Sequence, residues 1–211
     1  MTLKTSRDLK SIIKAAFLMQ TRHGPLAEQE ILSIVNEDDL RHVVDEGYIV
    51  RHRNEARYSL SGLGRSKIRV VLAGGVYDVL HLGHLAGLTE AKSLGDVLIA
   101  VVASDITVEM LKGRRPIFPQ EDRRKLVEGL KPVDRAILGY EDVGMGYEEV
   151  LKEIMPDVVA FGYDQENLER SVREIITRRK LRIQMIKLSK YENERHASST
   201  SVRQKLSEAL S

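Results

Sequence analysis

Two histidines three residues apart stand where an apolar run gives way to a helix. The run at residues 70–73 ends in Gly74-Gly75, His81-Leu82-Gly83-His84 follows, and a second apolar run covers residues 97–102. Strand, glycine turn, helix and strand form a βαβ unit, whose turn lies at the sheet edge where open α/β sheets bind ligands. Near a helix start at Leu85, both imidazoles would lie beside free N–H groups and could hold a phosphate. The alternative is two ordinary turn or capping histidines.

Two further segments have the chemistry of anion binding. Lys112-Gly113-Arg114-Arg115-Pro116 follows the second strand and supplies cations, although charge runs are often only solvated. Ser198 to Ser201 open the last expected helix with Arg203 one turn inside, an arrangement that cradles phosphate or merely caps the helix. Three such segments, distant in sequence, meet at one sheet edge and together indicate a polyphosphate site. The chain contains no GxxxxGK[ST], GxGxxG or HExxH pattern, which excludes P-loop, dinucleotide and HExxH zinc sites.

The elements that must position these residues alternate between strand and helix. Beyond the first βαβ unit, apolar runs predict strands at residues 135–138, 157–161 and 184–188. Helices are expected at residues 106–111, 119–130, 147–154, 168–179 and 199–210. The alternation predicts an α/β fold with a doubly wound, five-stranded parallel sheet of the Rossmann-like type over residues 68–211.

The first 62 residues have a different pattern. Helices are expected at residues 4–20, 26–35 and 37–46, the last with Asn36 as its N-cap and Gly47 just past its end. Short strands are expected at 48–50 and 57–60. Three helices followed by a hairpin resemble a winged helix-turn-helix domain. Residues 63–67 are rich in glycine and small polar residues and are expected to form a linker.

Winged helices usually bind DNA with their third helix in the major groove. Here that helix begins with Glu37-Asp38-Asp39, three carboxylates where phosphate repulsion would be strongest. A dimerisation or packing module is therefore favoured over DNA binding for this domain.

The composition narrows the class of protein. The chain has 211 residues, with 33 Lys and Arg against 31 Asp and Glu, so any affinity for anions must be local. It has no cysteine, which excludes disulfides, thiolate metal sites and cysteine nucleophiles. No apolar run approaches the roughly 18 residues that span a bilayer, and a cytoplasmic protein with no membrane partner is expected.

GGVYDVLHLGH and SSTSVR together resemble the first and last motifs of the HxGH nucleotidyltransferase superfamily, the cytidylyltransferase-like group. The resemblance implies that a phosphorylated acceptor attacks the α-phosphorus of a nucleoside triphosphate and that pyrophosphate leaves. It implies catalytic roles for His81, His84, Lys112 and Arg203, with His84 donating to the α-phosphate. Further nucleotide contacts are implied for Gly75, Val76, Tyr77, Gly83, Asp164, Ser199 and Thr200. Mg²⁺ is expected to arrive with the triphosphate, with no metal ligand in the protein, and a homodimer is expected.

Within that superfamily, the stretch PDVVAFGYDQ and the region around Lys112 are most similar to archaeal FAD synthases, which transfer AMP from ATP to FMN. The chain has Val76-Tyr77 and Leu82 where that family commonly has Thr-Phe and Pro. Two alternatives remain. One is a cytidylyltransferase that uses CTP and a phospho-alcohol such as glycerol 3-phosphate. The other is a DNA-binding regulator that senses a nucleotide.

Overall fold

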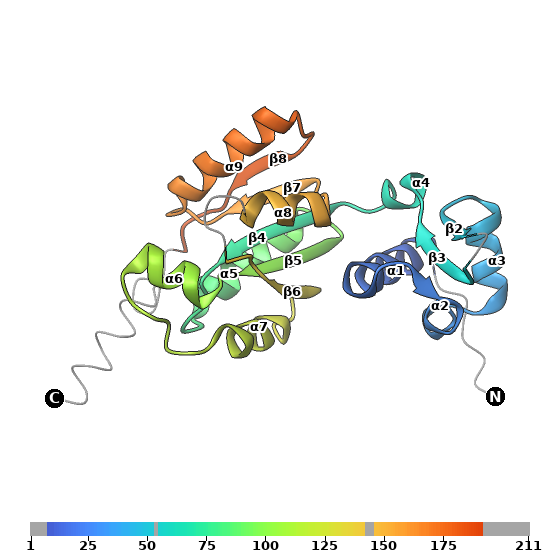
Figure 1. Cartoon of the computed structure of the whole chain (residues 1–211), viewed down its shortest axis with the longest axis horizontal. Helices are drawn as coiled ribbons and strands as arrows, with labels where there is room; N and C mark the ends of the chain where they lie inside the picture. The colour runs from blue at the N-terminus through green and yellow to red at the C-terminus, as the bar shows by residue number, and fades with distance from the viewer. Residues whose placement is uncertain (1–7, 53–54, 142–145, 192–211) are drawn as a thin grey trace. The chain divides into compact units, whose positions relative to one another are not determined.

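The computed structural model describes residues 8–52, 55–141 and 146–191. The chain divides into two compact units, residues 1–69 and 70–211, whose elements are labelled in Figure 1. None of the helices described is both long and apolar enough to cross a membrane.

The first unit combines four helices with a small antiparallel sheet in the part that is described. Its sheet has the order β1-β3-β2. The elements are α1 (Leu9–His23), β1 (Leu26–Ala27), α2 (Glu28–Ile34), α3 (Glu37–Asp45), β2 (Ile49–His52), β3 (Arg57–Leu60) and α4 (Gly62–Arg65). The prediction of one helix over residues 26–35 is wrong at its start, because Leu26 and Ala27 pair with Tyr58 and Arg57 of β3. The winged-helix assignment and the predicted domain bounds stay predictions.

Local signals set the helix ends in this unit. The Asn36 side chain accepts a hydrogen bond from the Asp39 amide at 2.7 Å, which confirms the predicted N-cap of α3. Gly47 follows α3 with φ of 74°, a conformation that glycine adopts without strain. The segment expected as a linker starts instead as the helical turn α4, because the Ser61 hydroxyl caps it through the Gly64 amide.

The second unit is built on the predicted five-stranded parallel sheet, which has the order β6-β5-β4-β7-β8. Figure 1 shows β4 at its centre. The strands are β4 (Val70–Gly75), β5 (Val97–Val102), β6 (Arg135–Leu138), β7 (Val158–Phe161) and β8 (Gln184–Lys187). Strand order reverses direction between β4 and β7, so the crevice at their carboxyl ends is where such sheets bind ligands.

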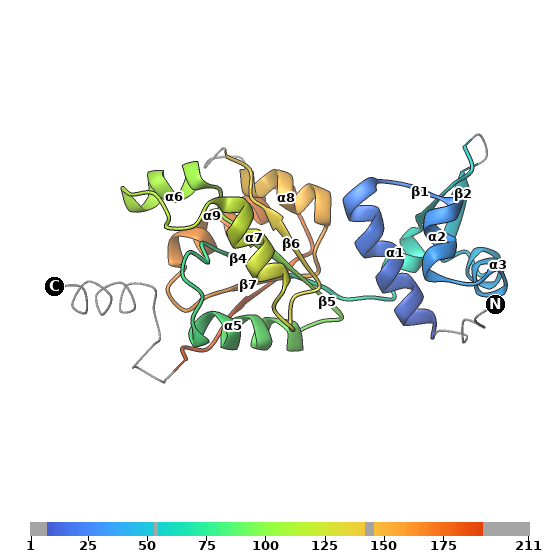
Figure 2. The ribbon, with the colours of Figure 1, turned by 90° about the horizontal axis from the view of Figure 1, so that it is seen from below.

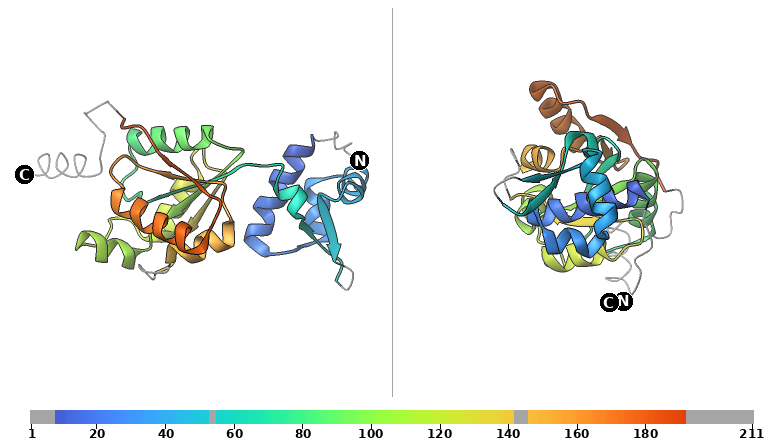
Figure 3. Two further views of the ribbon diagram at one scale, coloured as in Figure 1. Left: turned by 90° about the horizontal axis from the view of Figure 1, so that it is seen from above. Right: turned by 90° about the vertical axis from the view of Figure 1, so that its right-hand side faces the viewer.

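Helices cover both faces of this sheet. They are α5 (Leu82–Ser93), α6 (Asp105–Lys112), α7 (Gln120–Glu128), α8 (Gly146–Ile154) and α9 (Glu166–Arg179). Val71 and Ala73 of β4 pack in one cluster with Leu88 of α5 and Val127 of α7, so these two helices share a face. Figures 2 and 3 show α8 and α9 on the opposite face, with α6 displaced toward their side and away from α5. The carboxyl edge therefore has an α5 side and an α8 side.

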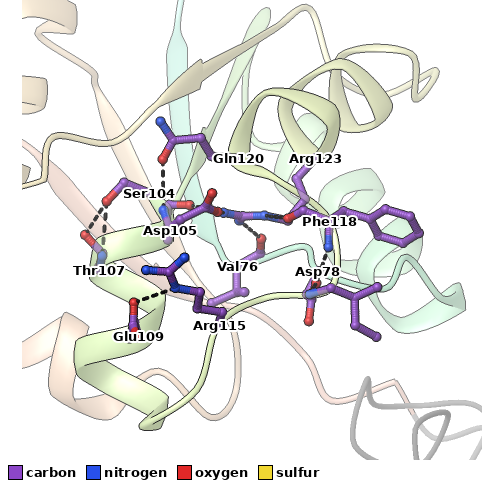
Figure 4. Close-up of polar contacts among 12 residues, drawn as sticks. Val76, Asp78, Ser104, Asp105, Thr107, Glu109, Arg115, Phe118, Gln120 and Arg123 are labelled. Carbon is purple, nitrogen blue, oxygen red and sulfur yellow. Dashed lines mark hydrogen bonds and ion pairs between the residues drawn. The ribbon is translucent and has the colours of Figure 1, made fainter.

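A buried guanidinium joins the loops at this edge. The side chain of Arg123 on α7 is 0% exposed, and it donates hydrogen bonds to the carbonyl oxygens of Val76, Ala103 and Phe118 at 2.5–2.9 Å. It also pairs with Asp105 at 2.7 Å. Figure 4 shows these contacts, which come from the loops after β4 and β5 and from the segment before α7. One side chain thus fixes three loops relative to one another.

We expect Arg123→Ala to lower the free energy of unfolding by about 3–5 kcal/mol, because it leaves buried carbonyls and Asp105 without their donor. Arg173→Ala is the control, since the Arg173 side chain is 61% exposed and pairs along α9 with Glu169. Its expected cost is about 0.5 kcal/mol or less. Urea unfolding measures both, and equal losses would contradict the assignment of Arg123 as the joint of the edge.

Candidate functional site

The histidine pair lies where β4 feeds α5. His81 is the N-cap of α5 with extended backbone angles, and its side chain makes no capping hydrogen bond. The helix begins at Leu82, one turn earlier than the predicted start near Leu85, because the His84 amide closes the first turn on the His81 carbonyl at 3.0 Å. The two imidazole rings stack with centroids 3.8 Å apart and planes inclined by 28°. An uncapped helix start and two adjacent imidazoles give this position the donors that bind anions.

Burial disfavours the protonated form of both imidazoles. It lowers the pKa of His81, and it lowers the pKa of His84 to about 4 with help from the neighbouring His81 and the charge of Lys112. The Nδ1 atoms of both rings are buried without a hydrogen-bond partner in the described part of the chain. Buried polar atoms are nearly always paired, so orphan atoms at such a position indicate a partner that is a ligand or water.

The ring of Tyr77 packs against the ring of His84. The backbone of Tyr77 has φ of 52°, an uncommon conformation for a residue other than glycine. Its ring is buried and meets the His84 ring edge-on at 5.2 Å. A Cβ atom on Gly75 would lie 2.6 Å from the Tyr77 ring, so glycine is required for this packing. The side chain of Tyr77 therefore packs in the core. The nucleotide contact that the resemblance implies for this residue would be made by its backbone.

The basic residues at the end of α6 and in the loop after it differ in their contacts. Arg114 lies 3.9 Å from Asp78, and Arg115 pairs with Glu109 at 3.1 Å. Lys112 is exposed at the end of α6, and its charge acts on His84. The buried carboxylate of Asp78 accepts hydrogen bonds from the amides of Ile117 and Phe118 at 2.6 and 3.2 Å, which ties this loop to the loop before α5 (Figure 4). Lys112 and the histidines are thereby brought to one place.

The turn after β7 closes the other side of the crevice. Asp164 is exposed there, and its neighbour Gln165 links the turn to β4. The Gln165 amide donates to the Gly74 carbonyl and accepts from the Gly162 amide, each at 2.8 Å. Gly75, Val76, Gly83 and Asp164 thus all lie at the carboxyl ends of β4 and β7. Ser199, Thr200 and Arg203, and the helix expected at 199–210, lie outside the described residues.

Sequence reasoning missed four residues that shape this edge: Asp78, Arg123, Tyr147 and Gln165. A signal existed only for Arg123, which precedes the buried Val127 by one helical turn and so shares its inward face. The other three act through backbone groups or packing that no local pattern shows.

Comparisons with known proteins bear on this arrangement. A family model described as cytidylyltransferase-like matches residues 72–205, more than half of the chain. The chain belongs to the cytidylyltransferase-like family. The match begins inside β4 and includes the histidine pair, Lys112 and Asp164, whereas residues 1–69 lie outside it.

Relatives of this cytidylyltransferase-like chain include curated proteins and one solved structure. It is 44% identical over 121 residues to the FAD synthase of Aciduliprofundum boonei, covering 57% of this chain and 78% of that protein. It is 43% identical over 140 residues to the FAD synthase of Thermoplasma acidophilum, covering 66% and 95%. The crystal structure described as the lipopolysaccharide core biosynthesis protein of Thermoplasma volcanium is 40% identical, with a TM-score of 0.55 over 59% of this chain and 99% of its own.

We expect Gly75→Ala to displace the Tyr77 ring and with it His84, because the added methyl group would lie 2.6 Å from that ring. The expected loss in stability is about 1–3 kcal/mol, the usual cost of overpacking. Gly87→Ala in α5 is the control, since its nearest neighbour would be 3.9 Å away and alanine favours a helix. In thermal unfolding, the melting temperature should fall for Gly75→Ala and rise for Gly87→Ala. An unchanged melting temperature of Gly75→Ala would contradict the packing.

The lowered pKa of His84 predicts a pH dependence of stability. Because the folded value of about 4 lies below the ordinary value of 6.5, the unfolded chain takes up the proton first as the pH falls. The contribution of His84 is therefore complete above pH 6.5 and is lost as the pH falls toward 4. Wild type should lose more stability than His84→Gln between pH 7 and pH 5 in urea unfolding. An NMR titration that placed His84 at or above 6.5 would contradict the buried neutral ring.

Proposed function

We propose that the protein transfers AMP from ATP to FMN and forms FAD. An oxygen of the FMN phosphate attacks the α-phosphorus of ATP, the new phosphoanhydride bond forms, and the bond to the β-phosphate breaks as pyrophosphate leaves. Such a transfer depends on positioning and on stabilising charge at the phosphorus. The carboxyl edge of β4 provides donors and a cation for that task.

Each residue has a role in this proposal. His81 and the uncapped start of α5 orient phosphate oxygens, and His84 donates to the α-phosphate as negative charge develops. A bound triphosphate favours the protonated imidazole, so it raises the pKa of His84 from its low value in the free protein. Lys112 bridges acceptor and triphosphate, Asp164 meets the ribose or base, and the β- and γ-phosphates are assigned to Ser199, Thr200 and Arg203.

Apolar side chains beside the site support a flavin as the acceptor. On α6, Ile106 is 46% and Met110 is 67% exposed, and in the loop tied to Asp78, Ile117 is 51% and Phe118 is 41% exposed. The isoalloxazine ring is wide and apolar and benefits from burial against such side chains, whereas a phospho-alcohol needs a small polar pocket. Ile106 and Met110 belong to the helix that ends at Lys112, and these exposed apolar side chains are the observation that carries the proposal. The names of the relatives, FAD synthases, agree with it.

Mg²⁺ is proposed to arrive with ATP as part of the substrate. Among the described residues, no three His, Asp or Glu side chains converge into a metal cage. The triphosphate oxygens and water would therefore supply most of its ligands.

A nucleotide-sensing DNA regulator is the alternative from another class. Its reading helix would be α3, whose exposed side chains include Glu37, Asp38, Asp45 and Glu46 against the single cation Arg41. This acidic surface would repel the phosphates of a duplex. The acidic surface of α3 thus argues against the regulator.

A pyrophosphate-release screen tests the function. It crosses ATP and CTP with FMN, glycerol 3-phosphate, phosphocholine and inositol phosphate, and product is identified by chromatography. We expect release with ATP and FMN only, accompanied by FAD. Release with CTP and a phospho-alcohol would replace the proposal by its cytidylyltransferase alternative, and salt-sensitive duplex binding without release would favour the regulator.

We expect His84→Ala to reduce turnover by about two orders of magnitude or more, the scale of removing one oriented donor to a developing oxyanion. His42→Ala on the exposed face of α3 is the matched control and should retain wild-type turnover. Steady-state rates of FAD formation measure both variants. Near-normal turnover of His84→Ala would remove this histidine from the mechanism.

A further inference from the structure

The hydroxyl group of Tyr147 is buried and has no hydrogen-bond partner in the part of the chain that the structure describes. Burial also raises the pKa of Tyr147, so the phenol is a neutral donor. Other tyrosine hydroxyls are paired: that of Tyr140 donates to Glu153 at 3.1 Å, and that of Tyr58 donates to Glu28 at 3.3 Å. A buried orphan hydroxyl destabilises the fold, so its retention points to a partner that binds from outside.

The orphan atoms of the second unit belong to residues around the carboxyl end of β4. Its described residues contain three such buried side-chain atoms, the Nδ1 atoms of His81 and His84 and the Tyr147 hydroxyl oxygen. A Cβ atom on Gly74 would lie 2.7 Å from that oxygen, while Gly75 faces the Tyr77 ring that supports His84. The histidines and Tyr147 therefore flank the same end of β4, from its two faces.

The position of Tyr147 indicates which of the two substrates it binds. The histidines begin α5, on one side of the edge, whereas Tyr147 belongs to α8 on the other side, which α6 also occupies (Figures 2 and 3). Ile106 and Met110 are exposed apolar residues of α6. In an in-line displacement, the attacking group and the leaving pyrophosphate lie on opposite sides of the α-phosphorus. In the proposed function, His81 and His84 hold phosphate oxygens of ATP, including those of the α-phosphate, on the α5 side, which leaves the α8 side for the acceptor.

We infer that Tyr147 binds the acceptor, with its hydroxyl donating a hydrogen bond to the phosphate group that attacks ATP. Tyr147 holds that phosphate while the apolar surface of α6 receives the ring. The inference rests on the proposed function and extends it, because it names a residue that separates acceptor binding from triphosphate binding.

Tyr147→Phe tests the inference because it removes only the hydroxyl. The Michaelis constant for FMN should rise about tenfold to a hundredfold, the effect of losing one hydrogen bond to a charged group. The Michaelis constant for ATP should stay within twofold of wild type. Flavin fluorescence titration should show the same loss of FMN affinity without turnover. Thermal stability should be unchanged or higher, since the lost hydroxyl had no partner.

Tyr140→Phe is the control, because its expected effects on stability and on substrate affinity are the reverse. It removes a hydroxyl that is bonded to Glu153, so a small loss of stability and unchanged Michaelis constants are expected. Unchanged FMN affinity in Tyr147→Phe, or a rise confined to the Michaelis constant for ATP, overturns the inference while FAD formation by wild type upholds the proposed function. Absence of FAD formation by wild type overturns the proposed function and the inference with it.

Discussion

The buried guanidinium of Arg123 is the contact on which the carboxyl edge depends. Its hydrogen bonds reach Val76 after β4, Ala103 after β5 and Phe118 before α7. Loops at a sheet edge have few hydrogen bonds of their own, and a planar group with several fixed donors can bind carbonyls from separate loops at once. The Asp78 carboxylate complements it by holding the amide groups of Ile117 and Phe118. The loop that leads from β4 to the histidine pair is therefore tied by side-chain hydrogen bonds to the two neighbouring loops.

These joined loops hold an electrostatic arrangement that favours anions. Two stacked neutral imidazoles and the charge of Lys112 lie beside an uncapped helix start. Neighbouring positive charge and burial both disfavour protonation of His84 while the site has no anion. Under the proposed function, the negative charge of a bound polyphosphate opposes both effects by favouring the protonated ring, so binding and proton uptake are coupled. Donors that are already oriented need no reorganisation when charge develops on the substrate.

The second unit could be predicted from sequence because its signals are local. The continuous apolar run of β5 is typical of a strand buried on both faces, and the histidine pair lies at the strand-to-helix turn as predicted. The helix predicted over residues 26–35 was wrong at Leu26 and Ala27, because these two residues form a strand only by pairing with β3. The spacing of Arg123 to Val127 indicates its inward face, but the carbonyls of Val76 and Ala103 that compensate its burial come from loops distant in sequence. Tyr147 was missed because an unpaired hydroxyl has no sequence pattern.

The two glycines that end β4 have no side chains, so only the backbone of the strand separates its two faces there. A phenol lies against each face, Tyr147 beside Gly74 and Tyr77 beside Gly75. Neither glycine places a Cβ atom between these rings and the strand, so both phenols approach the backbone directly. Under the proposed function, the acceptor and the triphosphate are thus served from opposite faces of one strand, and substitutions on α6 and α8 would change the choice of acceptor without altering the histidines that begin α5.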